Sequence, residues 1–153
     1  MKALFAAGCF WGVEEAFRKA TGVVATTVGY TGGKTKNPTY EDVCGDATGH
    51  AEAVLVEFDE KKTPFEKLLG VFWGCHDPTQ WHRQGPDVGS QYRSAIFFFS
   101  KAQEKEAIKS LGKEQEKLGK KIVTEITAAS TFYPAEEYHQ KYLQKHGKAL
   151  CHF

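Results

Sequence analysis

The residues best suited to chemistry lie at positions 8–12, which read Gly-Cys-Phe-Trp-Gly. Cys9 stands between a short apolar run, residues 3–7, and a run at residues 13–20 whose apolar side chains recur at helical spacing. A cysteine at a helix start faces unpaired backbone N–H groups and the positive end of the helix dipole. That environment favours the thiolate, which is the reactive form of cysteine. The pattern therefore indicates a nucleophile, with a buried structural cysteine as the alternative.

A thiolate nucleophile needs an acid or a base beside it, and the sequence offers two kinds. Glu52 begins a predicted strand, residues 51–58, on the same face as three apolar side chains. A carboxyl group beside an apolar surface tends to stay protonated, as a general acid requires, whereas the simpler interpretation is an exposed glutamate at a strand edge. His50, His76 and His82 allow a Cys-His-Asp arrangement for acyl transfer, although each is also typical of a surface loop.

The composition is that of one ordinary globular domain and argues against several classes of function. The chain has 153 residues, of which 25% are charged and 41% hydrophobic, and its net charge is +1. This balance gives no reason to expect nucleic acid or a membrane as a partner. Because no apolar run spans a bilayer and no signal-peptide pattern opens the chain, we expect a cytoplasmic protein. We also expect a monomer. The four cysteines form no CxxC pair, so neither a disulfide framework nor a metal site is expected.

Alternating strand and helix patterns predict an α+β domain. Strands are expected at residues 2–7, 23–30, 51–58, 93–99 and 121–129, and helices at residues 10–20, 64–74, 101–118 and 134–145. Capping boxes at residues 63–66 and 100–103 indicate the starts of two of the helices. Two loops without secondary structure, residues 31–50 and 76–91, are long for a compact domain, and such loops are usually functional. The order predicts a two-layer sandwich, a mixed sheet with helices packed on it, around a split βαβ (ferredoxin-like) core.

Five motifs, in order along the chain, resemble those of the A-type peptide methionine sulfoxide reductases. They lie at residues 8–12, 29–33, 48–54, 76–79 and 84–94. The resemblance covers nearly the whole chain, including residues 135–140 and the C-terminal tail. It implies a single catalytic domain over residues 1–153 that reduces methionine-S-sulfoxide, free or in proteins, to methionine and so repairs oxidative damage.

The resemblance also implies a chemistry for two cysteines and one carboxyl group. Cys9 would attack the sulfoxide sulfur while Glu52 protonates the oxygen, because a sulfoxide is a poor electrophile until its oxygen carries a proton. As methionine leaves, Cys9 would become a sulfenic acid. Cys151, in a mobile tail at residues 147–153, would then form a disulfide with Cys9, which thioredoxin or a similar external dithiol reduces. No metal or organic cofactor is implied.

The same resemblance implies a pocket for the substrate. Tyr30, Asp87 and Tyr92 would bind the sulfoxide oxygen, directly or through water, while Phe10 and Trp11 would hold the methyl group. Both tyrosines are predicted at strand ends beside flexible loops, where a phenol can donate to a ligand oxygen, although half-buried packing is the commoner role. A chiral sulfur held in such a pocket explains why a single epimer would be accepted.

The cysteines depart from the family pattern. Many relatives carry two C-terminal recycling cysteines, whereas this chain has one, Cys151. Cys44 and Cys75 are interpreted as unreactive packing residues, although Cys44 precedes Glu52 and stays a minor candidate for recycling. Two other functions stay open on the residues alone: a cysteine peroxidase or acyl-transfer enzyme, and a small binding module with incidental cysteines.

Overall fold

The computed structural model describes residues 1–146, and the predicted tail at residues 147–153 lies outside them. Six strands form one mixed sheet in the order β7-β6-β1-β3-β2-β8. These strands are β1 (Lys2–Ala7), β2 (Val23–Thr31), β3 (Ala51–Phe58), β6 (Ser94–Phe98), β7 (Glu125–Ala128) and β8 (Tyr133–Pro134). The α-helices are α1 (Phe10–Arg18), α2 (Tyr40–Cys44), α3 (Phe65–Gly74), α4 (Lys101–Lys117) and α5 (Tyr142–His146).

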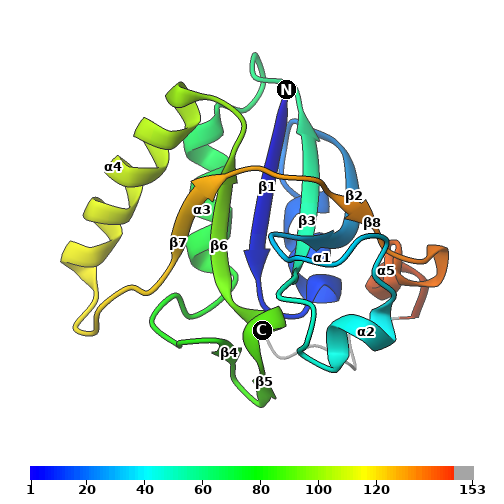
Figure 1. Cartoon of the computed structure of the whole chain (residues 1–153). Coiled ribbons are helices and arrows are strands. Elements are labelled where there is room, and N and C mark those ends of the chain that lie inside the picture. Colours follow the sequence, from blue (N-terminus) through cyan, green and yellow to red (C-terminus); the bar gives the residue numbers. More distant parts are fainter. Residues whose placement is uncertain (147–153) are drawn as a thin grey trace.

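The predicted split βαβ core is confirmed. Strand β3 lies between β1 and β2 and runs antiparallel to both, and β6 pairs with the other side of β1. β7 pairs with β6 in parallel, which makes the sheet mixed. In Figure 1 the helices α1 and α3 lie behind the sheet, whereas the chain between β7 and β8 crosses its front. The sheet is therefore covered on both faces near its centre.

Period-two alternation along the central strands divides the core between the two faces of the sheet. On the helix face, Phe5 stacks against Phe17 of α1, with ring centroids 4.8 Å apart, and against Phe72 of α3, at 5.4 Å. On the opposite face, alanines of three strands form a second cluster with Leu4 and Phe97. On β3 this alternation places Glu52 on the helix face, in line with Val54 and Val56.

The two predicted capping boxes have different outcomes. At α4 the Ser100 hydroxyl accepts the Gln103 N–H at 3.2 Å, as predicted, while the Gln103 side chain accepts the N–H of residue 99. At α3 the predicted box is wrong, because Pro64 itself is the N-cap and no side chain caps the helix. Thr63 is 3% exposed and packs against the chain at Gly22 instead.

Both long loops contain short elements that the sequence analysis missed. Residues 31–50 include α2, and residues 76–91 include a hairpin of β4 (Arg83–Gln84) and β5 (Asp87–Val88), followed by the 3-10 turn η1 (Ser90–Tyr92). The signal for α2 was present, since Thr39 and Asp42 form a reciprocal capping box. The strand predicted at residues 121–129 is shorter in the structure, where only β7 (Glu125–Ala128) forms.

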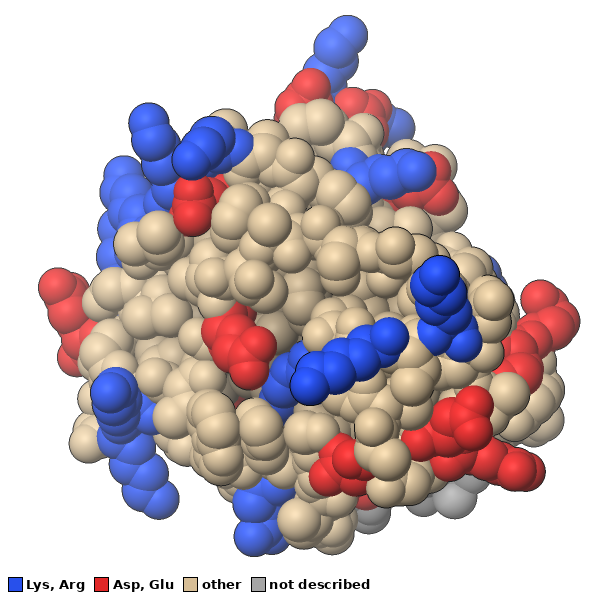
Figure 2. All heavy atoms as spheres, in the orientation of Figure 1, with Lys and Arg blue, Asp and Glu red and all other residues tan. Residues whose placement is uncertain are grey.

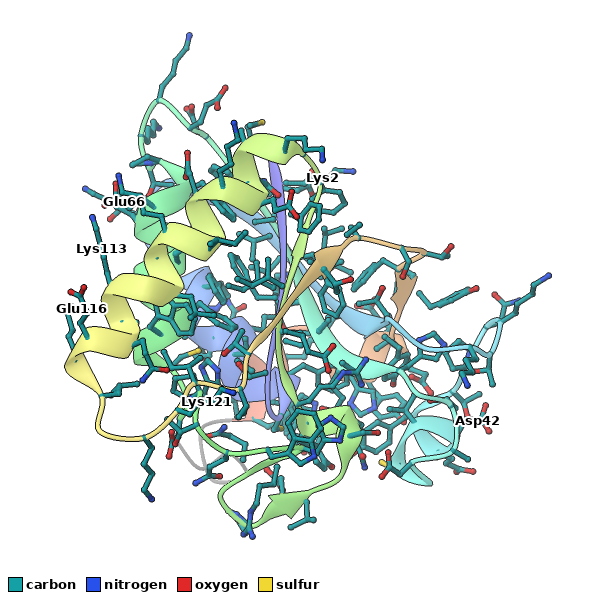
Figure 3. The ribbon with its side chains drawn as sticks, turned by 60° about the vertical axis from the view of Figure 1, so that its left-hand side comes forward. Lys2, Asp42, Glu66, Lys113, Glu116 and Lys121 are labelled. Atoms are coloured by element: carbon teal, nitrogen blue, oxygen red, sulfur yellow. The ribbon has the colours of Figure 1, made fainter. Side chains whose placement is uncertain are left out.

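Charged side chains of both signs are mixed over the face shown in Figure 2. In the turned view of Figure 3, Lys113 and Glu116 extend from α4 away from the sheet, on the side of the molecule opposite Asp42. Within residues 1–146, no helix combines the length and the apolar character needed to cross a bilayer.

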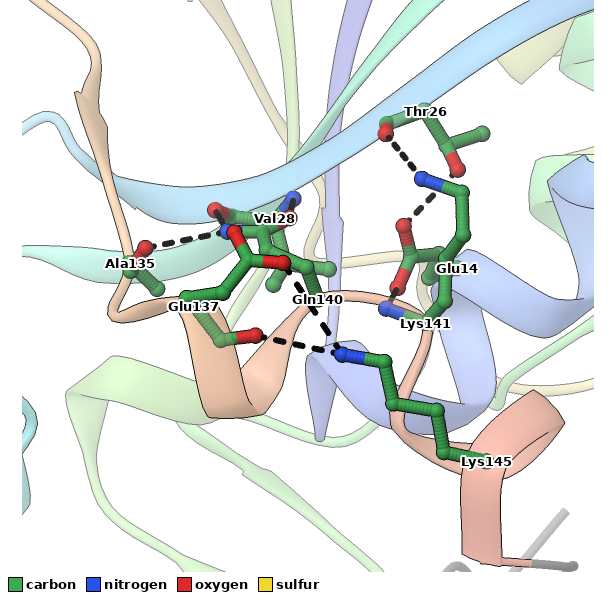
Figure 4. Close-up of polar contacts among 8 residues, drawn as sticks. All are labelled: Glu14, Thr26, Val28, Ala135, Glu137, Gln140, Lys141 and Lys145. Atoms are coloured by element: carbon green, nitrogen blue, oxygen red, sulfur yellow. Dashed lines mark hydrogen bonds and ion pairs between the residues drawn. The ribbon is translucent and has the colours of Figure 1, made fainter.

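The helix predicted at residues 134–145 is wrong, because this segment pairs with the edge of the sheet. It forms β8, the 3-10 turn η2 (Glu137–His139) and α5, and Lys141 has a φ of 52° between the last two. The Gln140 amide accepts the Val28 N–H and donates to the Val28 carbonyl, both at 2.9 Å (Figure 4). One side chain thus pairs with both backbone groups of Val28 on β2, whose carbonyl also accepts the Ala135 N–H at 2.9 Å.

Candidate active site

Cys9 occupies the predicted position at the start of α1, where it is the N-cap residue. Strand β1 ends at Ala7, and Gly8 then turns the chain with a φ of 102°, a conformation that strains any residue with a side chain. Cys9 is half-buried, and its carbonyl accepts the Val13 N–H at 3.4 Å. The first N–H groups and the dipole of α1 therefore favour negative charge at this position.

Glu52 lies beside the same helix start. It is 2% exposed, so the interpretation as an exposed strand-edge residue is wrong. Its Oε1 accepts the Phe10 N–H at 3.2 Å, and its Oε2 has no hydrogen-bond partner among the described residues. Burial raises the pKa of Glu52 well above the usual carboxyl value; the charges of Cys9 and Asp87 raise it further, while the Phe10 N–H lowers it. The structure thus favours a protonated carboxyl group next to Cys9.

The topology explains why these two residues meet. β1 and β3 are antiparallel neighbours, and Phe5 pairs with Val54. The end of β1 therefore lies beside the start of β3, so the residue that caps α1 is next to Glu52.

Tyr30 is the cross-strand partner of Glu52, but its hydroxyl is engaged elsewhere. It is fully buried and donates to Glu136 Oε1 at 2.9 Å. The other Glu136 oxygen accepts the N–H of Tyr40 at 3.0 Å. Burial and the hydrogen bond to Glu136 raise the pKa of Tyr30 above the usual phenol value. Glu136 therefore links β2 to the start of α2.

Tyr40 is a second phenol at the site, which the sequence analysis did not single out. Burial, the hydrogen bond with Cys44 and the charge of Glu52 raise the pKa of Tyr40 above the usual phenol value. Burial also raises the pKa of Tyr92, followed by the charge of Glu52 and smaller contributions that include Asp87. Tyr40, Tyr92 and Asp87 therefore lie within electrostatic range of Glu52.

Contacts between the two long loops hold this group together. The Ser90 hydroxyl and N–H donate to the Asp46 carboxylate, the latter at 3.4 Å, and the Gln91 amide donates to the Cys44 carbonyl at 3.4 Å. The loop that carries α2 is thereby joined to the segment that carries Asp87.

Phe10 and Trp11 differ in their surroundings. Phe10 is 1% exposed, and its ring lies 5.7 Å from that of Tyr30, within the core. Trp11 is half-buried and stacks on Tyr142 with ring centroids 3.9 Å apart. Its indole Nε1–H donates to His139 Nδ1 at 3.0 Å. Trp11 is thus the more accessible of the two predicted methyl contacts.

The histidines proposed as partners for Cys9 have other roles. His50 uses both ring nitrogens with backbone groups of the loop after β2. His76 lies between a backbone carbonyl of α3 and a serine hydroxyl of β6, and burial lowers its pKa to about 4. His82 stacks on its neighbour Trp81. These contacts give no support to the acyl-transfer alternative. Within residues 1–146, no three metal-ligating side chains cluster.

The full chain, residues 1–153, matches the family model described as peptide methionine sulfoxide reductase. The chain belongs to this family. A protein named peptide methionine sulfoxide reductase MsrA from Methanothermobacter thermautotrophicus is 57% identical over 153 residues, which cover 99% of this chain and 90% of that protein.

Solved structures of the same family agree with the fold of this reductase. Mxr1 from Saccharomyces cerevisiae in reduced form is similar with a TM-score of 0.94 and 39% identity, over 99% of this chain and 88% of that one. Mxr1 in complex with Trx2 is similar with a TM-score of 0.63 and 29% identity, over 93% and 84%. The predicted family and α+β fold are confirmed, and the chain is an oxidoreductase that reduces methionine sulfoxide.

The other cysteines of this reductase lie in different environments. Cys75 agrees with its interpretation as a packing residue, since burial raises its pKa to about 12. Cys44 is exposed at the end of α2, so the same interpretation is wrong for it. Burial and the charges of Glu52 and Cys9 raise the pKa of Cys44, and its hydrogen bond with Tyr40 lowers it. Cys151 lies outside the described residues.

Proposed function

We propose that this reductase acts on methionine-S-sulfoxide, free or in proteins, with Cys9 as the nucleophile and Glu52 as the general acid. The observation that carries the proposal is the buried Glu52 carboxyl, held by the Phe10 N–H next to the N-cap cysteine. Reduction of a sulfoxide needs a nucleophile at sulfur and a proton at oxygen together. A thiolate beside a protonated carboxyl group supplies both.

The proposed steps balance in atoms and electrons. Cys9 bonds to the sulfoxide sulfur as the Glu52 proton passes to the oxygen. The hydroxyl group then passes from the substrate sulfur to the Cys9 sulfur as the bond between the two sulfurs breaks, so methionine leaves and Cys9 becomes a sulfenic acid. Cys9 has lost the two electrons that the substrate gained. The thiol of Cys151 displaces water from the sulfenic acid and forms a disulfide, which an external dithiol reduces. The complex of Mxr1 with Trx2 supports a thioredoxin-type reductant.

We assign binding of the sulfoxide oxygen to Tyr92 and Asp87, as the sequence predicts, together with Tyr40. Tyr40 is preferred to the predicted Tyr30 because the Tyr30 hydroxyl already donates to Glu136. Phe10 and Trp11 stay the proposed contacts of the methyl group. A single catalytic domain over residues 1–153, a monomeric state and a cytoplasmic location belong to the same proposal.

An assay with separated epimers tests the proposed function. With dithiothreitol as reductant, the chain should release methionine from methionine-S-sulfoxide and leave the R epimer unreacted. The Cys9→Ser variant should release none. Equal turnover of both epimers, or turnover by Cys9→Ser, would refute the assigned specificity or the assigned nucleophile.

A further inference from the structure

Two strongly exposed apolar side chains, Trp81 and Val88, lie on the hairpin segment beside the site, and the reaction described above uses neither. Trp81 is 62% exposed and lies just before β4, whereas Val88 is 64% exposed and ends β5. Single apolar side chains scattered over a protein surface are normal. Two of them on one short hairpin leave apolar area that the described part of the chain does not cover.

The hairpin borders the site. Ser90, which follows it, donates to Asp46 in the loop that carries α2, and Figure 1 shows the hairpin at the end of the sheet where β1 stops. The charge of Asp87 contributes to the raised pKa of Glu52, so this residue of β5 lies within electrostatic range of the proposed acid. Because side chains alternate along a strand, the exposed Val88 lies on the outer side of the hairpin, away from that of Asp87.

Hydrogen bonds and ring stacking hold this hairpin in a fixed shape. The Gln84 side chain accepts the Asp77 N–H at 2.8 Å and donates to the Asp77 carbonyl at 2.9 Å. The Gly89 N–H donates to the His82 carbonyl at 2.9 Å. The Trp81 indole stacks on the His82 ring, with centroids 3.9 Å apart and an angle of 12° between the planes. An exposed ring that is already fixed loses little conformational entropy when a ligand packs on it.

The chemistry of the substrate indicates what would cover these side chains. The family to which the chain belongs is named for peptide methionine sulfoxide, so the reacting side chain arrives as part of a polypeptide. Methionine is an apolar residue of protein cores, and its oxidation disrupts the packing around it. A segment that exposes an oxidised methionine therefore exposes apolar neighbours as well. In an extended segment each neighbour lies about 3.3 Å farther along, so the residues that flank the sulfoxide pass the edge of the site.

We propose that Trp81 and Val88 bind the apolar residues that flank methionine sulfoxide in an extended segment of an oxidised protein. This role rests on the proposed function, because it requires the sulfoxide side chain to occupy the site at Cys9. Free methionine sulfoxide has no flanking residues. The two side chains should therefore affect turnover of peptides and leave turnover of the free amino acid unchanged.

Kinetics with two substrates test the proposal. The probes are free methionine-S-sulfoxide and a capped pentapeptide with methionine-S-sulfoxide at its centre and leucine on each side. Trp81→Ser should lower kcat/KM for the peptide about five- to tenfold, mainly through KM, because an anchoring tryptophan contributes strongly to binding. Val88→Ser should lower it about two- to threefold, since its apolar area is smaller. Trp81→Phe keeps a ring and should recover most of the loss.

Val24→Ser is the matched control, because Val24 is 74% exposed but lies far along the sheet from the site. It follows Val23, the partner of Phe58 at the end of β3 opposite Glu52. This variant should keep the wild-type kcat/KM for both substrates. Unchanged kcat/KM of Trp81→Ser for the peptide would overturn the proposal. An equal loss for the free amino acid would also overturn it, since that result indicates a distorted site.

Binding to the Cys9→Ser variant tests the docking without any turnover. The chain has three tryptophans, and Trp81→Phe identifies which indole N–H resonance belongs to Trp81. This resonance should shift when the leucine-flanked peptide is added to Cys9→Ser, and it should stay in place when free methionine-S-sulfoxide is added. No shift with the peptide would overturn the docking. Absence of reductase activity in wild type would instead refute the proposed function.

Discussion

Glu52 is a carboxyl group in a buried environment with few hydrogen-bond partners, which is unusual outside functional sites. It is almost fully buried, one oxygen accepts a single N–H, and the other has no partner among the described residues. Such burial penalises the charged form and favours the protonated form. The burial that would keep Glu52 protonated for the proposed reaction should therefore also lower the stability of the fold when Glu52 is charged.

The catalytic consequence can be tested with Glu52→Gln, which keeps the shape of the side chain but has no proton to give. Turnover should fall about 100-fold or more while KM changes little. Because the acid acts when protonated, wild-type turnover should decline as the pH rises through the raised pKa of Glu52. Near-normal turnover of Glu52→Gln between pH 5 and pH 9 would remove Glu52 from the mechanism.

The same variant should be more stable than wild type at neutral and alkaline pH. A carboxyl group whose pKa is raised in the folded state stabilises the fold below its unfolded pKa, and this stability is lost as the pH rises through the folded pKa. Glu52→Gln does not titrate, so its advantage should be absent near pH 4 and grow towards pH 8, to about 1–3 kcal/mol. Thermal unfolding at a series of pH values measures this. An advantage that does not change with pH would contradict the pKa direction.

The residues of the site were predictable to different degrees. The change of pattern at a helix start made Cys9 a candidate, and strand parity made Glu52 one, but only the resemblance to the family chose these roles over the alternatives. Tyr40 was not predictable, because its role depends on α2 and on contacts between two loops far apart in sequence. Tyr30 lies on β2 opposite Glu52, but its hydroxyl donates a hydrogen bond to Glu136, and no local sequence pattern indicates that contact.

Among the elements, the segment from β8 to α5 supports the site from outside the predicted pocket. It carries Glu136, which holds Tyr30 and the start of α2, and His139, which holds Trp11. The sequence analysis predicted a single helix for this segment, at residues 134–145. Pairing with β2 prevailed because the N–H of the buried residue Val28 would otherwise have no partner, which is costly.

A substitution of Gln140 should show how far the site depends on the segment from β8 to α5. Gln140→Leu leaves the Val28 N–H without its partner, whereas the Val28 carbonyl keeps the Ala135 N–H, and the change should lower the free energy of unfolding by about 1–3 kcal/mol. It should also reduce kcat/KM, since Glu136 and His139 lose their support. Gln144→Leu, at an exposed position on α5, is the matched control and should change neither quantity. Equal stability of the two variants in urea unfolding would contradict the pairing role.

For the whole molecule, the ferredoxin-like topology brings the chemistry together. Antiparallel pairing of β1 with β3 sets the end of one strand beside the start of the other, and α1 begins where β1 ends. Cys9 and Glu52, the proposed nucleophile and acid, are 43 residues apart in sequence (52 minus 9) yet close in space. This order of strands was predictable from the alternation of elements, whereas the hairpin and α2 were hidden in polar loops.

The proposed recycling of Cys9 uses Cys151, which lies within residues 147–153. Cys151→Ser should still release about one methionine per chain without reductant, because the first step uses Cys9 and Glu52 but not Cys151. Steady turnover with thioredoxin should collapse, with partial rescue by small thiols. Cys44→Ser is the matched control, since Cys44 is the exposed cysteine beside the site, and it should keep normal turnover. Normal thioredoxin-dependent turnover of Cys151→Ser would show that recycling does not use Cys151.

The most direct test of the central claim is a single turnover of the reduced chain with excess methionine-S-sulfoxide and no reductant. We expect about one methionine released per chain, with Cys9 oxidised in step, as read by mass spectrometry of the cysteine peptides. Glu52→Gln should reach the same final amount about 100-fold or more slowly, and Cys9→Ser should release none. Release of methionine by Cys9→Ser, or release by wild type with Cys9 still reduced, would contradict the account.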